Sequence, residues 1–313
     1  MQTYIHYSRI EKTKPTDFIS TSYAAYHMEL DRYRPGSVIY TEKHALMTSD
    51  GTTTHLIAGN STQRGYREGV GADARFYLIT GFTQISAKRV VVADYKNHCV
   101  RLIDRASNTT TSVFSGQCES PGYQDGRQAK ISYPTFVVMD QKNKNQLLIA
   151  EERPGAVRTV DVNSQATYTF EKTDILRGIN YITQDEKSGD LYVTAYHAIY
   201  KIRYLRKGVT LIAGSYGMKS RGYTDGKSYD SLFHFAHDLI FITPHTLLVG
   251  DVRNNKLRLL DMYYNKVTTL NVTNSLNKPA SLLLTNNSLY VGQNKAIIQY
   301  KCEYVSIKIS SKN

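Results

Sequence analysis

The sequence is short of several residue types and patterns, and each shortage excludes a class of protein. Of its 313 residues none is Trp, 3 are Cys and 7 are Pro, while 41% are hydrophobic. A chain of this composition is neither a disulfide-dense scaffold nor a disordered protein. The longest apolar runs, such as Val90–Ala93, fall far short of the ~20 residues of a membrane-spanning helix, so we expect no membrane insertion. Met1–Lys14 has no apolar core, so we expect no signal peptide there.

Acidic residues are also scarce relative to basic ones. Lys and Arg number 39 against 27 Asp and Glu, which gives a formal net charge of +12. Such a surface attracts polyanions. Tyr is frequent, with 25 residues, and Tyr and β-branched residues favour strands. An all-β protein is therefore the leading interpretation.

An internal repeat decides the architecture. A short apolar run that ends in a polar residue recurs at start-to-start steps of 44, 57, 44, 56 and 42 residues. The six copies are Ala45–Asp50, Arg89–Asp94, Gln146–Glu151, Asp190–Ala195, Thr246–Asp251 and Ser288–Gln293. This period matches one propeller blade of about four strands. The sequence predicts a six-bladed β-propeller with four-stranded antiparallel blades.

Two further elements recur in register with these runs. In three copies an Arg follows the final acidic residue by seven positions, and we expect Arg101, Arg158 and Arg258 to pair with turn carboxylates between blades. A Gly-Tyr-x-Asp/Glu-Gly loop occurs at Gly65–Gly69, Gly122–Gly126 and Gly222–Gly226, and we interpret it as a turn between strands. The blade near residues 176–203 lacks that loop.

The run Ile57-Ala58-Gly59, the Gly65–Gly69 loop, Val91–Asp94 and Asn97–Arg101 together resemble the NHL repeat. The resemblance spans about residues 34–300 and implies an NHL-type propeller. We expect an N-terminal segment at residues 1–33 and a single propeller at 34–313, closed by a strand from Ser22–Met28 or Val305–Ile309. The predicted blade starts are Pro35, Thr80, Pro134, Gly178, His237 and Pro279.

The resemblance also offers a test for catalysis. Lyases of the NHL family bind zinc through three His at the start of innermost strands, and a catalytic zinc needs about three protein ligands. The corresponding positions here are Gly36, Thr80, Thr135, Gly178, His237 and Ala280. With one His among them, and with no Gly-x-Ser-x-Gly elbow or phosphate loop, we expect no metal, no cofactor and no enzyme. An enzyme with a diverged channel site near His237 is kept as an alternative.

The cysteines and sequons bear on the compartment. Cys99 and Cys118 flank one predicted hairpin, and extracellular NHL proteins of animals carry a similar pair, so we predict a disulfide; two free thiols are the alternative. Cys302 stays unassigned. Glycosylation sequons begin at Asn60, Asn108, Asn271 and Asn286, a number that chance alone produces. These features favour a secreted or cell-surface protein over a cytoplasmic one.

The first functional hypothesis is a non-catalytic recognition propeller that binds an extracellular protein or an anionic glycan through loops on its two faces. The contact loops are predicted at Asn60–Gly71, Gln117–Gly126 and Ser215–Gly226. The candidate binding residues are Tyr66, Arg67, Tyr123, Tyr223, Arg221, Lys219 and His237. The three tyrosines serve equally well as partner anchors or as packing between blades. An RNA-binding propeller, using cations for phosphate and aromatics for stacking, is the alternative.

Overall fold

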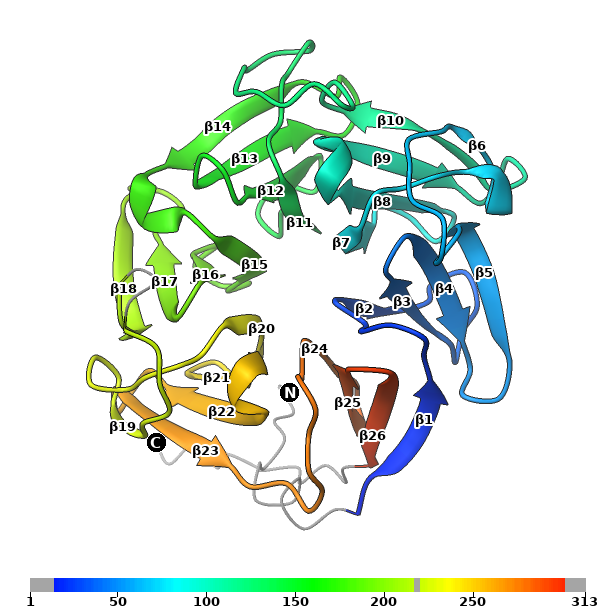
Figure 1. The fold of residues 1–313 in the computed structure, drawn as a ribbon. Helices are drawn as coiled ribbons and strands as arrows, with labels where there is room; N and C mark the ends of the chain where they lie inside the picture. Colours follow the sequence, from blue (N-terminus) through cyan, green and yellow to red (C-terminus); the bar gives the residue numbers. More distant parts are fainter. Residues whose placement is uncertain (1–13, 217–219, 302–313) are drawn as a thin grey trace, which may run out of the picture.

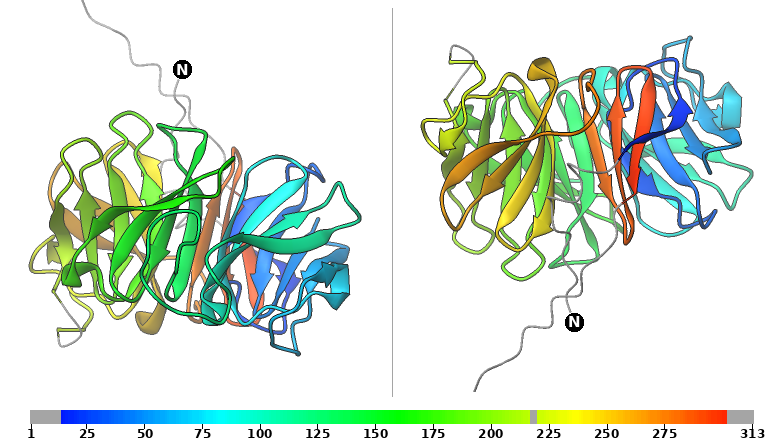
Figure 2. Two further views of the ribbon diagram at one scale, coloured as in Figure 1. Left: turned by 90° about the horizontal axis from the view of Figure 1, so that it is seen from above. Right: turned by 90° about the horizontal axis from the view of Figure 1, so that it is seen from below.

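A computed structural model describes residues 14–216 and 220–301. Predictions for most of Met1–Lys14, for Lys219, for Cys302 and for Val305–Ile309 lie outside these residues. The described chain forms six antiparallel sheets arranged around one axis, which Figure 1 views end-on. Figure 2 shows the resulting disc from two sides, with the strands running between its two faces. The predicted six-bladed propeller is confirmed.

Each blade is a meander of four strands, numbered here from the axis outward. Blade 1 consists of β2 (Met28–Leu30), β3 (Val38–Glu42), β4 (Ala45–Ser49) and β5 (Thr54–Gly59). Blade 2 consists of β7 (Ile79–Gln84), β8 (Arg89–Asp94), β9 (Cys99–Asp104) and β10 (Thr110–Ser115), with the short β6 (Gly69–Val70) outside β10. Blade 3 consists of β11 (Pro134–Met139), β12 (Gln146–Glu151), β13 (Ala156–Asp161) and β14 (Thr167–Lys172).

The second half of the ring repeats this plan. Blade 4 consists of β15 (Ile179–Gln184), β16 (Leu191–Ala195), β17 (Ala198–Ile202) and β18 (Val209–Gly214). Blade 5 consists of β20 (Ala236–Thr243), β21 (Thr246–Asp251), β22 (Lys256–Asp261) and β23 (Lys266–Leu270), with the short β19 (Gly226–Lys227) outside β23. Blade 6 consists of β24 (Ser281–Leu284), β25 (Ser288–Gln293), β26 (Ala296–Lys301) and β1 (Thr16–Ser20). Four short 3₁₀ turns complete the described elements: η2 (Gly71–Asp73), η3 (Tyr95–Asn97), η4 (Asp174–Leu176) and η5 (Val252–Asn254).

The core lies between blades rather than within them. The second strands are buried on both faces, as in β8, where Val90–Ala93 are fully buried, and this explains their continuous apolar runs. Each cluster of buried side chains joins neighbouring blades; one of them packs Ile39 of blade 1 against Phe82 and Val92 of blade 2. A single blade therefore has no core of its own, and the ring folds as one unit.

The ring is closed by the N-terminal strand β1, which pairs antiparallel with β26 as the outermost strand of blade 6, with Thr16 opposite Gln299 and Ser20 opposite Ala296. The chain then crosses from the outside of blade 6 to the axis, where β2 opens blade 1. Ser22–Met28 is thus mostly a crossing segment, not the closing strand. The N-terminal segment therefore supplies the closing strand, at Thr16–Ser20 rather than at Ser22–Met28.

Blade 1 was predicted one strand out of frame. The copy of the repeated run in this blade, Ala45–Asp50, contains the third strand, whereas the run in the other blades forms the second, because β3 lies between β2 and β4. The true second strand, Val38–Glu42, has the expected pattern of an apolar run ending in a carboxylate. The predicted start of this blade at Pro35 is therefore wrong, and the innermost strand begins at Met28. The other five predicted starts fall within two residues of an innermost strand.

Candidate functional site

The predicted disulfide is present. Cys99, the first residue of β9, is joined to Cys118, which follows β10, with an S–S length of 2.03 Å and a Cα–Cα distance of 5.0 Å. Both cysteines lie at the same end of the β9–β10 hairpin, as the sequence predicted. The bridge fixes the start of the loop that leads from blade 2 to blade 3.

The three recurring arginines are fully buried ion-pair partners. Arg101 contacts Asp94 at 3.2 Å, Arg158 contacts Glu151 at 2.8 Å and Arg258 contacts Asp251 at 2.8 Å, all with side chains that are 0% exposed. Each of these carboxylates ends the second strand of the same blade, so these three pairs lie within blades. The predicted pairing with turn carboxylates is found in addition for Arg158 and Arg258, whose partners are Asp125 and Asp225 of the connecting loops. Burial raises the pKa of Asp94 to about 6 and that of Glu151 to about 7, while the facing guanidinium opposes the rise.

The recurring loops hold these arginines in place. Arg158 also contacts Asp125 at 2.6 Å and Arg258 contacts Asp225 at 2.7 Å, and both donate to loop carbonyls. The loop tyrosines cover the guanidinium groups at 4.9 Å for Tyr66, 4.5 Å for Tyr123 and 5.0 Å for Tyr223. The tyrosines thus pack over a buried cation, while Tyr66 and Tyr223 keep 37% and 50% of their surface exposed.

The predicted contact loops lie on the outer rim of the disc. β6 pairs with the outermost strand β10, Gly126 bridges to Thr167 of β14, and β19 pairs with β23. They cover strand edges that would otherwise be open to unwanted pairing. Arg67 donates to the carbonyl of Asp73 at 2.6 Å within its own loop, and Arg221 is exposed. The structure thus does not bring the candidate residues of these loops together with His237 at one site.

A different set of cations gathers on one face, which we call the entry face because the innermost strands begin there. Strand directions alternate, so the turns that join second to third strands lie on this face too. Five of these six turns carry a basic residue, at Lys43, Lys96, Arg153, Arg253 and Lys295. Glu152 is the one carboxylate in the six turns. The sequence contains a signal for these five cations, because each follows the end of its second strand by one or two residues.

Aromatic rings lie beneath several of these cations. Lys96 of blade 2 and Arg153 of blade 3 both lie over the ring of Tyr133, at 4.9 and 5.2 Å. Lys43 covers Tyr23 at 4.3 Å, and Arg253 covers Phe235 at 5.4 Å. Such contacts fix the direction of a cation while its charged end still meets solvent.

Histidine side chains join neighbouring blades below this face. Nδ1 of His44 accepts the backbone N–H of Leu78 at 2.9 Å, and Nδ1 of His98 accepts that of Tyr133 at 3.2 Å. His197 does the same for Phe235 at 3.0 Å. An accepting Nδ1 requires a neutral ring. Burial, with Lys43 and Arg64 nearby, lowers the pKa of His44 to about 4.

The hub is lined by residues from the innermost strands, and pairing with the second strands aligns them. In each innermost strand, one residue pairs with the residue two positions before the end of the second strand. In blades 1, 2, 4 and 5 these residues are Met28, Phe82, Ile182 and Leu239. Two residues earlier, the six positions are Tyr26, Thr80, Thr135, Asn180, His237 and Ala280. The predicted Gly36 and Gly178 are thus wrong, since blade 1 was out of frame and the register in blade 4 differs by two residues.

Correct alignment places His27 in the hub, a residue that sequence reasoning missed. Its ring packs against Phe82 and Phe136 at 4.8 and 4.7 Å, and Nε2 lies 3.6 Å from Glu29. In β20, the innermost strand of blade 5, burial lowers the pKa of His237 to about 4 and raises that of Asp238 to about 7. Side chains whose pKa values are shifted in this way are found at functional sites and in structural cores alike.

Several polar atoms of the hub are buried. Nδ1 of His27 and Nδ1 of His237 have no hydrogen-bond partner. Oδ2 of Asp238 accepts the N–H of Leu282 at 2.8 Å, and the Asp238 carboxylate also forms a hydrogen bond with Tyr181. Across residues 14–216 and 220–301, no three His, Cys, Asp or Glu side chains are grouped as a metal site would need. In the same part of the chain, no helix has the length and apolarity to cross a membrane.

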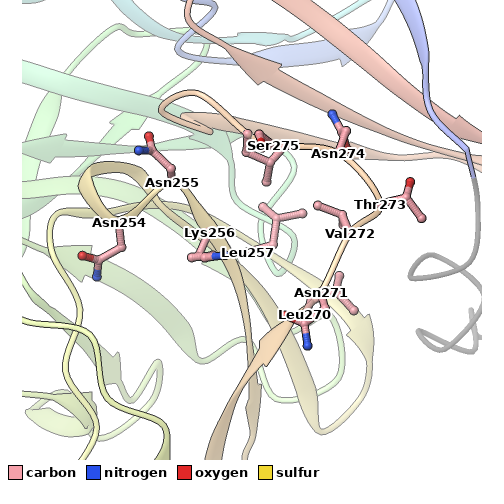
Figure 3. A pocket seen from close by; sticks show the side chains of 11 residues that line it. Asn254, Asn255, Lys256, Leu257, Leu270, Asn271, Val272, Thr273, Asn274 and Ser275 are labelled. Carbon is pink, nitrogen blue, oxygen red and sulfur yellow. The ribbon is translucent and has the colours of Figure 1, made fainter.

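A groove of about 430 Å³ lies on the entry face, between blade 5 and the connection that leads to blade 6. One wall is the turn at Asn254 and Asn255, and the other is the connection that follows β23, from Asn271 to Leu276 (Figure 3). Leu257 and Leu270 line it between these walls. The groove therefore combines an apolar floor with amide and hydroxyl groups.

The sequon asparagines all have some exposure to solvent. Asn108, Asn271 and Asn286 are exposed, and Asn60 is half-buried with its Oδ1 accepting from Thr62 and Gln63. Asn108 and Asn286 lie in turns on the face opposite the entry face. Asn271 lines the groove.

Comparison with known proteins supports the fold class. No family model matches the chain. The chain is 24% identical over 280 residues to Protein SUPPRESSOR OF QUENCHING 1, chloroplastic, of Arabidopsis thaliana, covering 77% of this chain and 26% of that protein. It therefore spans about a quarter of the length of this relative.

Two solved structures are similar in fold, both described as an auxiliary nutrient binding protein. The one from Bacteroides thetaiotaomicron has a TM-score of 0.69 and 13% identity over 91% of this chain and 70% of that one. The one from Bacteroides ovatus has a TM-score of 0.69 and 14% identity over 96% and 76%. At such identities the likeness shows the propeller architecture alone.

Proposed function

We propose that this protein is a non-catalytic recognition propeller that binds an anionic glycan on its entry face. The observation that carries the proposal is the set of five cations at equivalent turns, Lys43, Lys96, Arg153, Arg253 and Lys295. A cation that recurs around a ring presents regularly spaced charge to a flexible polyanion. Basic residues such as Lys142, Lys144 and Arg206 also lie in turns of the opposite face, so the recurrence at equivalent turns, rather than net charge, distinguishes the entry face.

Three further features support a secreted or cell-surface glycoprotein of this kind. The Cys99–Cys118 bridge is typical of an oxidising compartment. The exposed Asn108 and Asn286 are accessible to glycosylation. The similar propellers of Bacteroides are described as nutrient binding proteins, which fits a propeller that captures a ligand.

The entry face suits a glycan better than RNA. Single-stranded RNA needs open aromatic faces on which bases stack. Here Tyr133, Tyr23 and Phe235 are already covered by cations of the same face. The catalytic alternative is also weaker, since Nδ1 of His237 and Oδ1 of Asp238 are buried.

The test compares two double variants that remove the same charge. Lys96→Ser with Arg153→Ser removes two exposed cations of the entry face, and Lys187→Ser with Arg206→Ser removes two exposed cations of the opposite face. Binding of heparin is measured by calorimetry across a range of salt concentrations. We expect the first pair to lower affinity by about tenfold and to reduce the salt dependence, and the second pair to change it less than about twofold.

Equal losses in both pairs would show that net charge alone drives binding and would overturn the proposal. Tighter binding of single-stranded RNA than of heparin at the same salt concentration would favour the RNA-binding alternative.

A further inference from the structure

The groove between blade 5 and its connection to blade 6 lies on the face that carries the cations. Its first wall follows η5, and its second wall is the connection from β23 to β24 (Figure 3). Its volume, about 430 Å³, is in the range of small-molecule sites. It is therefore large enough to take one unit of a larger ligand.

The chemistry of the lining selects a class of ligand. Leu257, Leu270, Val272 and Leu276 provide apolar surface, and Asn255, Ser275 and Lys256 provide polar groups. No carboxylate lines the groove, so nothing in it favours a cationic ligand. Lys256 instead favours a negative group.

One wall is held rigid by its own hydrogen bonds. Nδ2 of Asn254 donates to the carbonyl of Gly222 at 2.7 Å and to Asp251 at 2.8 Å. Oδ1 of Asn255 accepts the backbone N–H of Lys278 at 2.8 Å. The amide oxygen of Asn255 is thus used by the protein, and only its NH₂ group remains for another partner.

From this geometry we infer that the groove binds one negatively charged sugar unit at the end of, or within, the anionic glycan. The apolar face of a sugar ring packs on the leucines, its hydroxyl groups meet Asn255 and Ser275, and its sulfate or carboxylate meets Lys256. Arg253 and Lys278, next to the two walls, extend the positive field towards the neighbouring units. The inference rests on the proposed function and adds the position and the chemistry of its specific subsite.

Asn271 lines the same groove and heads a sequon. An N-glycan on this residue would cover the site, so binding requires the form in which Asn271 is unmodified. Protein for the test is accordingly checked by mass spectrometry for an unmodified Asn271.

The test uses a sulfated heparin-derived tetrasaccharide, its desulfated analogue and the heparin polymer. Ser275→Trp fills the groove, and Ser107→Trp adds the same ring to an exposed serine on the opposite face. Lys256→Ser removes the charge alone. We expect Ser275→Trp to weaken tetrasaccharide binding at least tenfold. Polymer binding should weaken only a few-fold, since the five cations of the entry face still bind the polymer. Lys256→Ser lowers affinity for the sulfated form alone, and Ser107→Trp has no effect.

The outcomes separate the two proposals. If tetrasaccharide binding is unchanged by Ser275→Trp while polymer binding still responds to loss of Lys96 and Arg153, the groove is not the subsite and the proposed function stands. If the unsubstituted protein binds neither the tetrasaccharide nor the polymer, both fail. Equal binding of the desulfated analogue would overturn the requirement for a negative group.

Discussion

A buried guanidinium in contact with one strand-end carboxylate recurs in blades 2, 3 and 5, and its neighbours explain why it is tolerated. Arg158 has 0% exposure, yet it faces Glu151 and Asp125 and donates to a loop carbonyl. Transfer of an unpaired charge from water to such a place is prohibitive, so each member of the pair depends on the other. Tyr123 closes the arrangement from outside.

Removal of one member of this pair is therefore expected to be severe. Arg158→Met leaves Glu151 buried without its counter-charge and should lower the free energy of unfolding by about 3–5 kcal/mol. Arg127→Met, at an exposed position, should change it by less than about 0.5 kcal/mol. Urea unfolding followed by circular dichroism measures both. A loss below about 1 kcal/mol for Arg158→Met would mean that the ion pair is not a main support of blade 3.

At the scale of elements, the turns between second and third strands have two roles. Their basic residues are the five cations of the entry face, while His44, His98 and His197 bind the next blade through a backbone N–H. Asn255 has the same role in blade 5, with an amide oxygen as acceptor. Contact between blades thus depends on neutral rings at three of these positions.

This arrangement predicts a pH-dependent contribution to stability. The folded-state pKa of His44, about 4, lies below the ordinary value of 6.5, so its contribution is full above pH 6.5 and is lost as the pH falls towards 4. His44→Asn keeps an acceptor that does not titrate. Between pH 7 and pH 4.5 the wild-type protein should lose about 1–3 kcal/mol more unfolding free energy than this variant.

Unfolding free energies of both proteins at several pH values provide the measurement. Buried carboxylates such as Glu151 titrate in both proteins, so the comparison isolates the histidine. Parallel pH profiles for the two proteins would contradict this account of the inter-blade contact.

At the scale of the whole molecule, stability depends on closure of the ring. β1 and β26 are paired although about 280 residues separate them, and Phe18 of β1 packs edge-on against Tyr290 at 5.0 Å. Loss of β1 uncovers the edge of β26 and the adjoining apolar surface. Since all blades share inter-blade cores, such a loss affects the entire ring.

Truncation tests this closure directly. Deletion of residues 1–20 should abolish the single cooperative unfolding transition or cause aggregation, whereas deletion of residues 1–15 keeps all of β1 and should retain that transition. Differential scanning calorimetry of the two truncated proteins distinguishes these results. A sharp, unshifted transition after loss of β1 would show that the ring does not need the strand.

The sequence by itself determined the six-fold repeat, five blade starts and the Cys99–Cys118 bridge. These features depend on residues close together in the chain, where strand period and hairpin geometry impose the pattern. The functional geometry depended on the tertiary structure. The closing strand, the place of His27 beside the hub, the position of the Tyr66, Tyr123 and Tyr223 loops on the rim, and the gathering of five cations on one face all follow from pairing between distant strands. The direction and register of those strands are fixed only when the ring closes and its blades bury a common core.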